Sequence, residues 1–75
     1  QETDHKSRLQ EVLQKKFKVP PAYEMTHAAG PEHDKTFQVF VHMGRKVLGR
    51  GSGKTKKEAE KAAARKALET MHDER

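Results

Sequence analysis

The sequence has no cysteine and no tryptophan, and its aromatic residues are one tyrosine and three phenylalanines. Without cysteine there is no disulfide framework and no thiolate metal site, which favours a reducing compartment. No apolar run approaches the length of a membrane span, and no secretory signal pattern opens the sequence. We therefore expect a soluble, cytoplasmic protein with no membrane association.

Length sets the next limit. Seventy-five residues are enough for one small domain, close to the size at which a single core only just offsets chain entropy. Charged residues make up 36% and hydrophobic residues 32% of the chain, yet the apolar positions are periodic, which argues against disorder. We expect residues 1–75 to be one domain with its core over about residues 4–71.

Positive charge is concentrated in one segment. The formal net charge is +5, but residues 1–44 carry six basic and six acidic side chains, whereas residues 45–66 carry nine basic and two acidic ones. A stripe of one sign indicates a polyanionic partner, most commonly nucleic acid. The competing interpretation is an ordinary solvated helix face.

The apolar periodicity predicts an α+β fold of order α-β-β-β-α. Leu9, Val12, Leu13 and Phe17 lie at helical spacing. Proline and glycine mark the breaks between segments. The predicted elements are a helix over 4–16, a strand over 23–28, a loop over 30–35, strands over 36–43 and 46–51, and a helix over 56–71. Gly44 and Arg45 suit a tight hairpin turn, so the three-stranded sheet should be antiparallel, with both helices packed on one face.

Two features of the predicted elements stand out. The first helix gathers a polar face without an apolar member, formed by Ser7, Gln10, Glu11 and Gln14. Taken alone, such a face is most simply a wet helix surface. In the second strand Phe40 falls on the polar face, where a large ring should be wet unless something covers it, so it marks a possible contact surface.

The stretch from Gly49 to Leu68 joins a glycine-punctuated, lysine-bearing loop to an alanine-rich helix. Thr55 and Glu58 have the spacing of a capping box, in which the glutamate reaches back to the start of the helix, so the helix should begin at Lys56. Lys54, Lys56 and Lys57 then lie at a helix N-terminus, where free amides and the helix dipole favour a phosphate. A nucleotide-binding loop is excluded, because Leu48 stands where its first glycine is required.

Catalytic and metal-binding patterns are missing. The five histidines offer no pair on one helical face, and the carboxylates are dispersed rather than grouped for metal-assisted phosphodiester hydrolysis. We therefore assign this chain no catalytic residue, no metal ligand and no cofactor.

Taken together, these segments resemble the double-stranded RNA-binding domain over about residues 4–68. The resemblance rests on the Leu9-Gln10-Glu11 segment, on Gly30-Pro31-Glu32-His33 with Lys35 and Phe37, and on the stretch LGRGSGKTKKEAE from Leu48 to Glu60. The glycine-proline-x-histidine loop and the start of the last helix are most similar to the C-terminal domain of bacterial ribonuclease III.

The resemblance implies which residues contact RNA. Domains of this class read the shape of an A-form duplex over about 16 base pairs, across two successive minor grooves and the intervening major groove. It implies minor-groove contacts from Ser7, Gln10, Glu11 and Gln14, contacts in the next minor groove from Pro31, Glu32 and His33, and phosphate contacts from Lys54, Lys56 and Lys57. Glu60 stands where many members of the wider family carry a third lysine, so one phosphate contact is in doubt.

The resemblance also implies a parent enzyme. The acidic catalytic motif of ribonuclease III, its magnesium and its homodimer contacts belong to a separate N-terminal domain. Two other functions remain open: a non-enzymatic double-stranded RNA-binding adapter or RNA-processing cofactor, which could recruit a protein through the sheet face around Phe40 or through the second helix, and a general basic DNA-binding domain. The last lacks a helix that presents base-reading side chains along one face.

Overall fold

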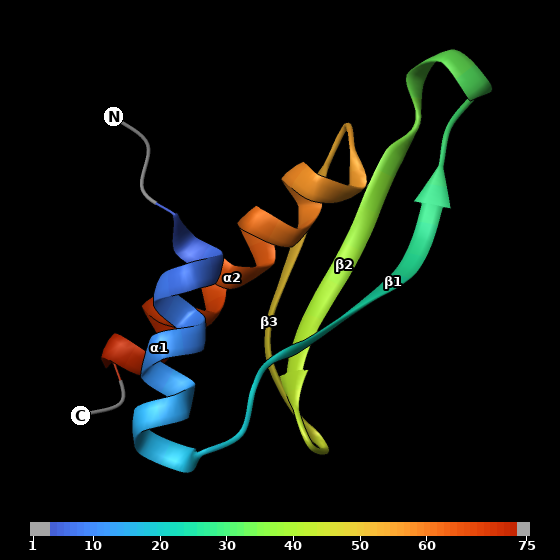
Figure 1. Ribbon diagram of the computed structural model, residues 1–75. Coiled ribbons are helices and arrows are strands. Elements are labelled where there is room, and N and C mark those ends of the chain that lie inside the picture. Colours follow the sequence, from blue (N-terminus) through green and yellow to red (C-terminus); the bar gives the residue numbers. More distant parts are fainter. Residues whose placement is uncertain (1–3, 74–75) are drawn as a thin grey trace.

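The computed structural model describes residues 4–73 and shows the predicted order of elements (Figure 1). Residues 1–3 and 74–75 of the predicted 1–75 domain lie outside the described part. The elements are α1 (His5–Phe17), β1 (Ala22–Ala29), the 3-10 turn η1 (Glu32–Asp34), β2 (Thr36–Met43), β3 (Lys46–Gly53) and α2 (Lys56–Asp73). The α+β prediction is confirmed, and the elements extend one to two residues beyond several predicted ends.

The three strands form an antiparallel sheet in the order β1-β2-β3. Tyr23 and Met25 pair with Val41 and Val39 of β2, so both lie on the same face of the sheet as these two buried valines. The register then shifts between Met25 and His27. Met25 nevertheless remains 47% exposed, because β1 is an edge strand.

A two-residue turn joins β2 to β3. Met43 pairs with Lys46, which leaves Gly44 and Arg45 as the loop, as predicted. Gly44 has φ +61° and Arg45 has no positive φ. Positive φ at the first turn position alone is the pattern of a type II′ turn, which matches the twist of the strands it joins.

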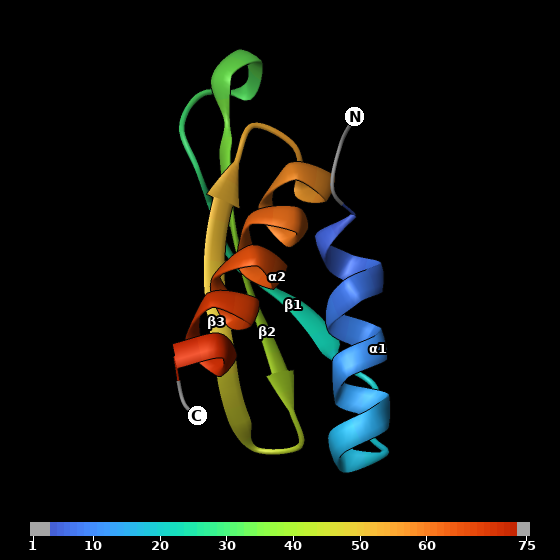
Figure 2. The same cartoon turned by 90° about the vertical axis from the view of Figure 1, so that its left-hand side faces the viewer.

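Three glycines on one face of β3 allow α2 to lie directly on this strand (Figure 2). A Cβ atom at Gly49 would come within 2.6 Å of the Ala67 backbone nitrogen, and one at Gly51 would overlap the backbone of Ala62 and Ala63. A Cβ atom at Gly53 would approach Glu58 Cβ to 2.8 Å. The glycines therefore serve helix–sheet packing, and β3 continues to Gly53, two residues past its predicted end.

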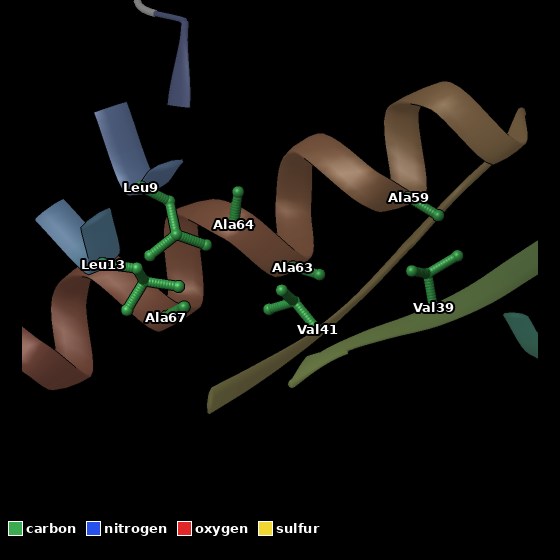
Figure 3. Close-up of a cluster of buried hydrophobic side chains, with 8 residues drawn as sticks. All are labelled: Leu9, Leu13, Val39, Val41, Ala59, Ala63, Ala64 and Ala67. Carbon is green, nitrogen blue, oxygen red and sulfur yellow. The ribbon is translucent and has the colours of Figure 1, made fainter. Parts of the chain in front are cut away.

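The core consists of side chains from α1, β2 and α2 (Figure 3). Leu9 and Leu13 of α1 lie beside the alanines of α2, while Val39 and Val41 of β2 lie beneath that helix. Both helices lie on one side of the sheet, but α2 alone packs broadly on β2 and β3, and α1 packs against α2 (Figure 2). The fully buried residues are Leu9, Leu13, Val39, Val41, Ala59, Ala63, Ala64 and Ala67.

Two sequence-based expectations about apolar residues need correction. Phe17, predicted on the buried face of α1, is 48% exposed, because it is the last residue of the helix. Phe40, expected to be wet unless something covers it, is partly exposed. Its ring lies 5.3 Å from that of His42, which in turn contacts Glu24 Oε2 at 3.1 Å and the Gly44 carbonyl oxygen at 2.9 Å.

Neither of the two long helices is apolar enough over the residues described to cross a membrane.

Candidate nucleic-acid interface

The first predicted patch, on α1, is organised by the helix N-cap. Asp4 caps α1 by accepting the Ser7 amide at Oδ1 (3.2 Å) and the Ser7 hydroxyl at Oδ2 (2.8 Å). These hydrogen bonds lower the pKa of the Asp4 carboxyl, and the charge of Lys61 acts in the same direction. Ser7 is exposed, but its hydroxyl proton is engaged, so toward a ligand it offers oxygen lone pairs.

The other three residues of the α1 patch take no part in the N-cap hydrogen bonds. Gln10, Glu11 and Gln14 are exposed along the helix, while Leu9 and Leu13 are fully buried. Each glutamine amide can both donate and accept a hydrogen bond, which suits a 2′-hydroxyl that also does both.

The second patch lies in the β1–β2 loop, which forms one 3-10 turn. Gly30 has φ +106°, and a Cβ atom there would come within 2.6 Å of the Asp34 carbonyl oxygen. The Asp34 amide donates to the Pro31 carbonyl oxygen at 2.9 Å. Only glycine readily fits this backbone. The turn leaves Pro31, Glu32 and His33 exposed.

The third patch is the start of α2. The Glu58 amide donates to Thr55 Oγ1 at 3.0 Å, and α2 begins at Lys56, as predicted. The Glu58 carboxylate accepts the amide of Lys54 at 3.3 Å, one residue before the capping threonine. This bond is a variation on the expected capping box. The side chains of Lys54, Lys56 and Lys57 are exposed.

An ion pair connects the second patch to the third. Lys54 Nζ lies 2.8 Å from Asp34 Oδ1, and both side chains are largely exposed. The hydrogen bond from Lys54 and its positive charge lower the pKa of the Asp34 carboxyl. Sequence reasoning missed Asp34, because no local spacing rule relates residues 20 positions apart.

The structure shows what Glu60 does in place of a lysine. Its carboxylate accepts a hydrogen bond from Lys6 Nζ at 2.7 Å, and the Glu60 side chain is only 18% exposed. The same ammonium lies 4.9 Å from the centroid of the Tyr23 ring, so Lys6 links α1 to Glu60 of α2 and to Tyr23 of β1. Lys61 of α2 is only partly exposed, and its positive charge contributes to the lowered pKa of the Asp4 carboxyl.

The three patches follow one another across the molecule. In Figure 1 the β1–β2 loop, the start of α2 and α1 succeed each other from the upper right to the lower left. Figure 2 shows the same succession, with the start of α2 between the other two. A basic helix start is thus flanked by two exposed polar elements. The RNA-binding roles of the individual residues stay predictions.

Among the side chains that the structure describes, no group of three or more histidine, aspartate or glutamate residues could hold a metal ion.

An α-β-β-β-α fold that presents two polar elements around a basic helix start defines a nucleic-acid-binding domain. The chain belongs to the double-stranded RNA-binding motif family, whose pattern it matches over residues 5–71.

Its sequence relatives include ribonuclease 3 of Treponema denticola, with 53% identity over 72 residues, and that of Borreliella afzelii, with 50% identity over 70 residues. These matches cover 96% and 93% of this chain but 29% of each relative. The chain thus spans less than a third of the length of those enzymes.

Solved structures show the same fold. A structure of Arabidopsis HYL1, described in terms of miRNA processing, matches with a TM-score of 0.78 and 37% identity over 93% of this chain and 99% of that one. Dicer from Pichia stipitis matches with a TM-score of 0.73 and 32% identity over 88% of this chain and 32% of that one.

Proposed function

We propose that this domain anchors double-stranded RNA for a ribonuclease III endoribonuclease, by shape and backbone contacts that are largely independent of sequence. The observation that supports it most is the placement of the basic start of α2 between two exposed polar elements. The identity of about half the residues to bacterial ribonucleases 3 supports the choice of parent enzyme.

Each patch takes one groove in this proposal. Gln10, Glu11 and Gln14 of α1 contact 2′-hydroxyls and base edges in one minor groove, with Ser7 as a hydrogen-bond acceptor at the edge of this contact. Pro31, Glu32 and His33 enter the next minor groove. Lys54, Lys56 and Lys57 contact phosphates across the major groove between them. Glu60 takes no phosphate, because its carboxylate is itself an anion; it pairs with Lys6 instead.

Cleavage belongs to a part of the parent protein that precedes this domain. That part would hold the catalytic carboxylates, a divalent metal such as magnesium and the contacts of a homodimer. We place the parent enzyme in the cytoplasm, where it would process RNA that includes ribosomal RNA precursors. This domain supplies substrate binding and orientation.

The test of the RNA-binding role uses the two lysines of the first turn of α2. The double variant Lys56→Ala/Lys57→Ala should bind a duplex RNA more weakly, because two phosphate contacts are lost. The logarithm of the binding constant falls with the logarithm of salt concentration by about 0.9 per phosphate neutralised in B-form DNA, so the variant should also show a shallower slope. Fluorescence anisotropy over a series of salt concentrations measures both. An affinity equal to that of the unsubstituted domain would contradict the proposal.

A matched control is Lys66→Ala, on the far part of α2, where the lysine lies 3.9 Å from Glu69 and outside the three patches. It changes the net charge without removing a proposed contact, so its binding should change much less.

The alternative is a non-enzymatic adapter or RNA-processing cofactor. The partly exposed Phe40 ring on the face of the sheet opposite the helices favours it, because an adapter needs a protein-binding surface apart from the RNA contacts. Sequencing the parent reading frame upstream of Gln1 distinguishes the two: a ribonuclease domain there supports the enzyme, and further binding domains support the adapter.

A further inference from the structure

The ion pair between Asp34 and Lys54 lies between two of the proposed RNA contacts. Asp34 follows His33 directly in η1, and Lys54 immediately precedes the N-cap of α2. Their Oδ1 and Nζ atoms are 2.8 Å apart, with side-chain exposures of 61% and 64%. One of the three lysines assigned to phosphate is therefore already occupied by a carboxylate.

The other two lysines differ from Lys54 in this respect. Among the residues that the structure describes, Lys56 and Lys57 form no ion pair. A phosphate can approach either of them without displacing an internal anion. At Lys54 the phosphate and the Asp34 carboxylate require the same ammonium group, and two anions close together repel each other.

Asp34 and Lys54 differ in how far the charged group lies from a bonded backbone. The Asp34 amide is bonded to the Pro31 carbonyl oxygen, and the turn is closed by Gly30 at φ +106°. Lys54 has its amide held by Glu58, but its ammonium lies at the end of a flexible four-carbon stem. When a phosphate competes, the lysine side chain can move and the carboxylate stays.

An exposed ion pair of this kind is weak enough to open. Measured pairs at protein surfaces contribute about 0.2–1 kcal/mol, because water screens the charges and two long side chains lose rotamer freedom. The pair can thus reduce the affinity of the domain for RNA without preventing binding.

We propose that Asp34 is an internal competitor for Lys54, whose carboxylate occupies the phosphate-binding ammonium and thereby lowers the affinity of the domain for double-stranded RNA. This inference rests on the proposed function, in which Lys54 contacts a phosphate. Asp34 contributes no favourable RNA contact; it sets how much affinity the third lysine adds.

Two substitutions at position 34 separate competition from positioning. Asp34→Asn removes the charge but keeps an oxygen that can accept a hydrogen bond from Lys54, whereas Asp34→Ala removes both. Competition predicts that both variants bind a duplex RNA more tightly, by about two- to five-fold at low salt, as the size of such a pair allows. If Asp34 instead positioned Lys54, Asp34→Ala would bind more weakly, and that result would overturn the inference.

A double-mutant cycle tests whether the effect passes through Lys54. In a Lys54→Ala background, Asp34→Asn should raise the affinity for duplex RNA by less than half as much as it does in the unsubstituted domain, because no ammonium remains to be released. Glu69→Gln is the matched control: it removes one carboxylate of similar exposure that is paired with Arg65 at 3.3 Å but lies outside the three patches. The inference would be contradicted if Glu69→Gln raised the RNA affinity as much as Asp34→Asn does, or if Asp34→Asn raised it fully in the absence of Lys54. Either result would attribute the effect to net charge alone.

Anisotropy titration of one duplex RNA against all six proteins, the unsubstituted domain and its five variants, gives these comparisons, with circular dichroism to verify folding. If the unsubstituted domain bound no duplex RNA, the proposed function would fail, and this inference with it. If that domain bound and Asp34→Asn bound equally, the inference alone would fail.

Discussion

Tyr23 lies where α1, α2 and β1 meet, in an environment that opposes ionisation of its phenol. Among residues 4–73 its buried hydroxyl has no hydrogen-bond partner. Burial, followed by the negative charges of Glu60 and Asp4, raises the pKa of Tyr23 to about 12. The Lys6 ammonium lies over the Tyr23 ring and donates a hydrogen bond to Glu60. Neither of these contacts involves the Tyr23 hydroxyl.

The raised pKa gives a stability effect of definite sign. An unfolded tyrosine ionises near pH 10, so between pH 10 and about 12 the unfolded chain releases a proton that the folded protein retains. Folding stability should be unaffected by this group below pH 10 and should fall as the pH rises through that window. Since Tyr23 is the sole tyrosine, ultraviolet absorbance follows its ionisation directly.

Tyr23→Phe is the control for this effect, because it keeps the ring and removes the ionisable group. Its urea unfolding midpoint should decline less between pH 10 and 12 than that of the unsubstituted protein. Identical declines, or an absorbance midpoint near pH 10 in protein that circular dichroism shows to be folded, would refute the assignment.

At the scale of elements, the closest contact in the fold is that of α2 on β3. Glycine at positions 49, 51 and 53 leaves one face of the strand without side chains over residues 49–53, and the facing residues of α2 are alanines, with Glu58 beside Gly53. Small residues on both sides bring two backbones together, so a small domain obtains a dense core from few large side chains. This contact also holds the lysine-bearing start of α2 beside the sheet edge.

Gly51→Ala should therefore destabilise the fold well beyond the ordinary effect of this change. A methyl group at this position would overlap the Ala62–Ala63 backbone, which cannot move without displacing the helix. Overpacking of a core typically costs about 1–3 kcal/mol, occasionally more. Urea denaturation should show a lower midpoint or an unfolded chain. Ser52→Ala, at an exposed neighbouring position, should stay within about 0.5 kcal/mol of the unsubstituted protein, and equal midpoints for the two variants would count against this account.

The sequence predicted the elements that have strong periodicity or a capping signal. The alternation in β2, the alanine arc of α2 and the Thr55 cap are local patterns, and local patterns determined these segments. The Lys6–Glu60 and Asp34–Lys54 pairs depend on how elements pack and join residues 54 and 20 positions apart. The glycines at every second position of β3 are a sequence signal for close helix packing, but beside lysines the same glycines are also typical of a phosphate-binding loop.

At the scale of the whole molecule, charge and recognition are divided between elements. The lysines at the start of α2 provide attraction to any polyanion, since phosphates are common to RNA and DNA. A 2′-hydroxyl distinguishes the two polymers, and in the proposed arrangement α1 and the β1–β2 loop reach it in successive minor grooves. Replacing the lysines should therefore weaken binding to RNA and DNA alike, whereas replacing the glutamines should weaken binding to RNA more than binding to DNA.

Matched RNA and DNA duplexes measure this division. The unsubstituted domain should prefer RNA clearly. Gln10→Ala/Gln14→Ala should lose about tenfold in RNA affinity, if each lost hydrogen bond is worth about 0.7 kcal/mol, with little loss for DNA, so that the preference narrows. Lys56→Ala/Lys57→Ala should weaken binding to both duplexes by similar factors and leave the ratio nearly unchanged. Equal affinity of the unsubstituted domain for the two duplexes would remove the minor-groove role of Gln10 and Gln14 and return the domain to the class of general basic binders. If Lys56→Ala/Lys57→Ala instead lost the preference for RNA over DNA, the residues that distinguish the two polymers would lie at the start of α2.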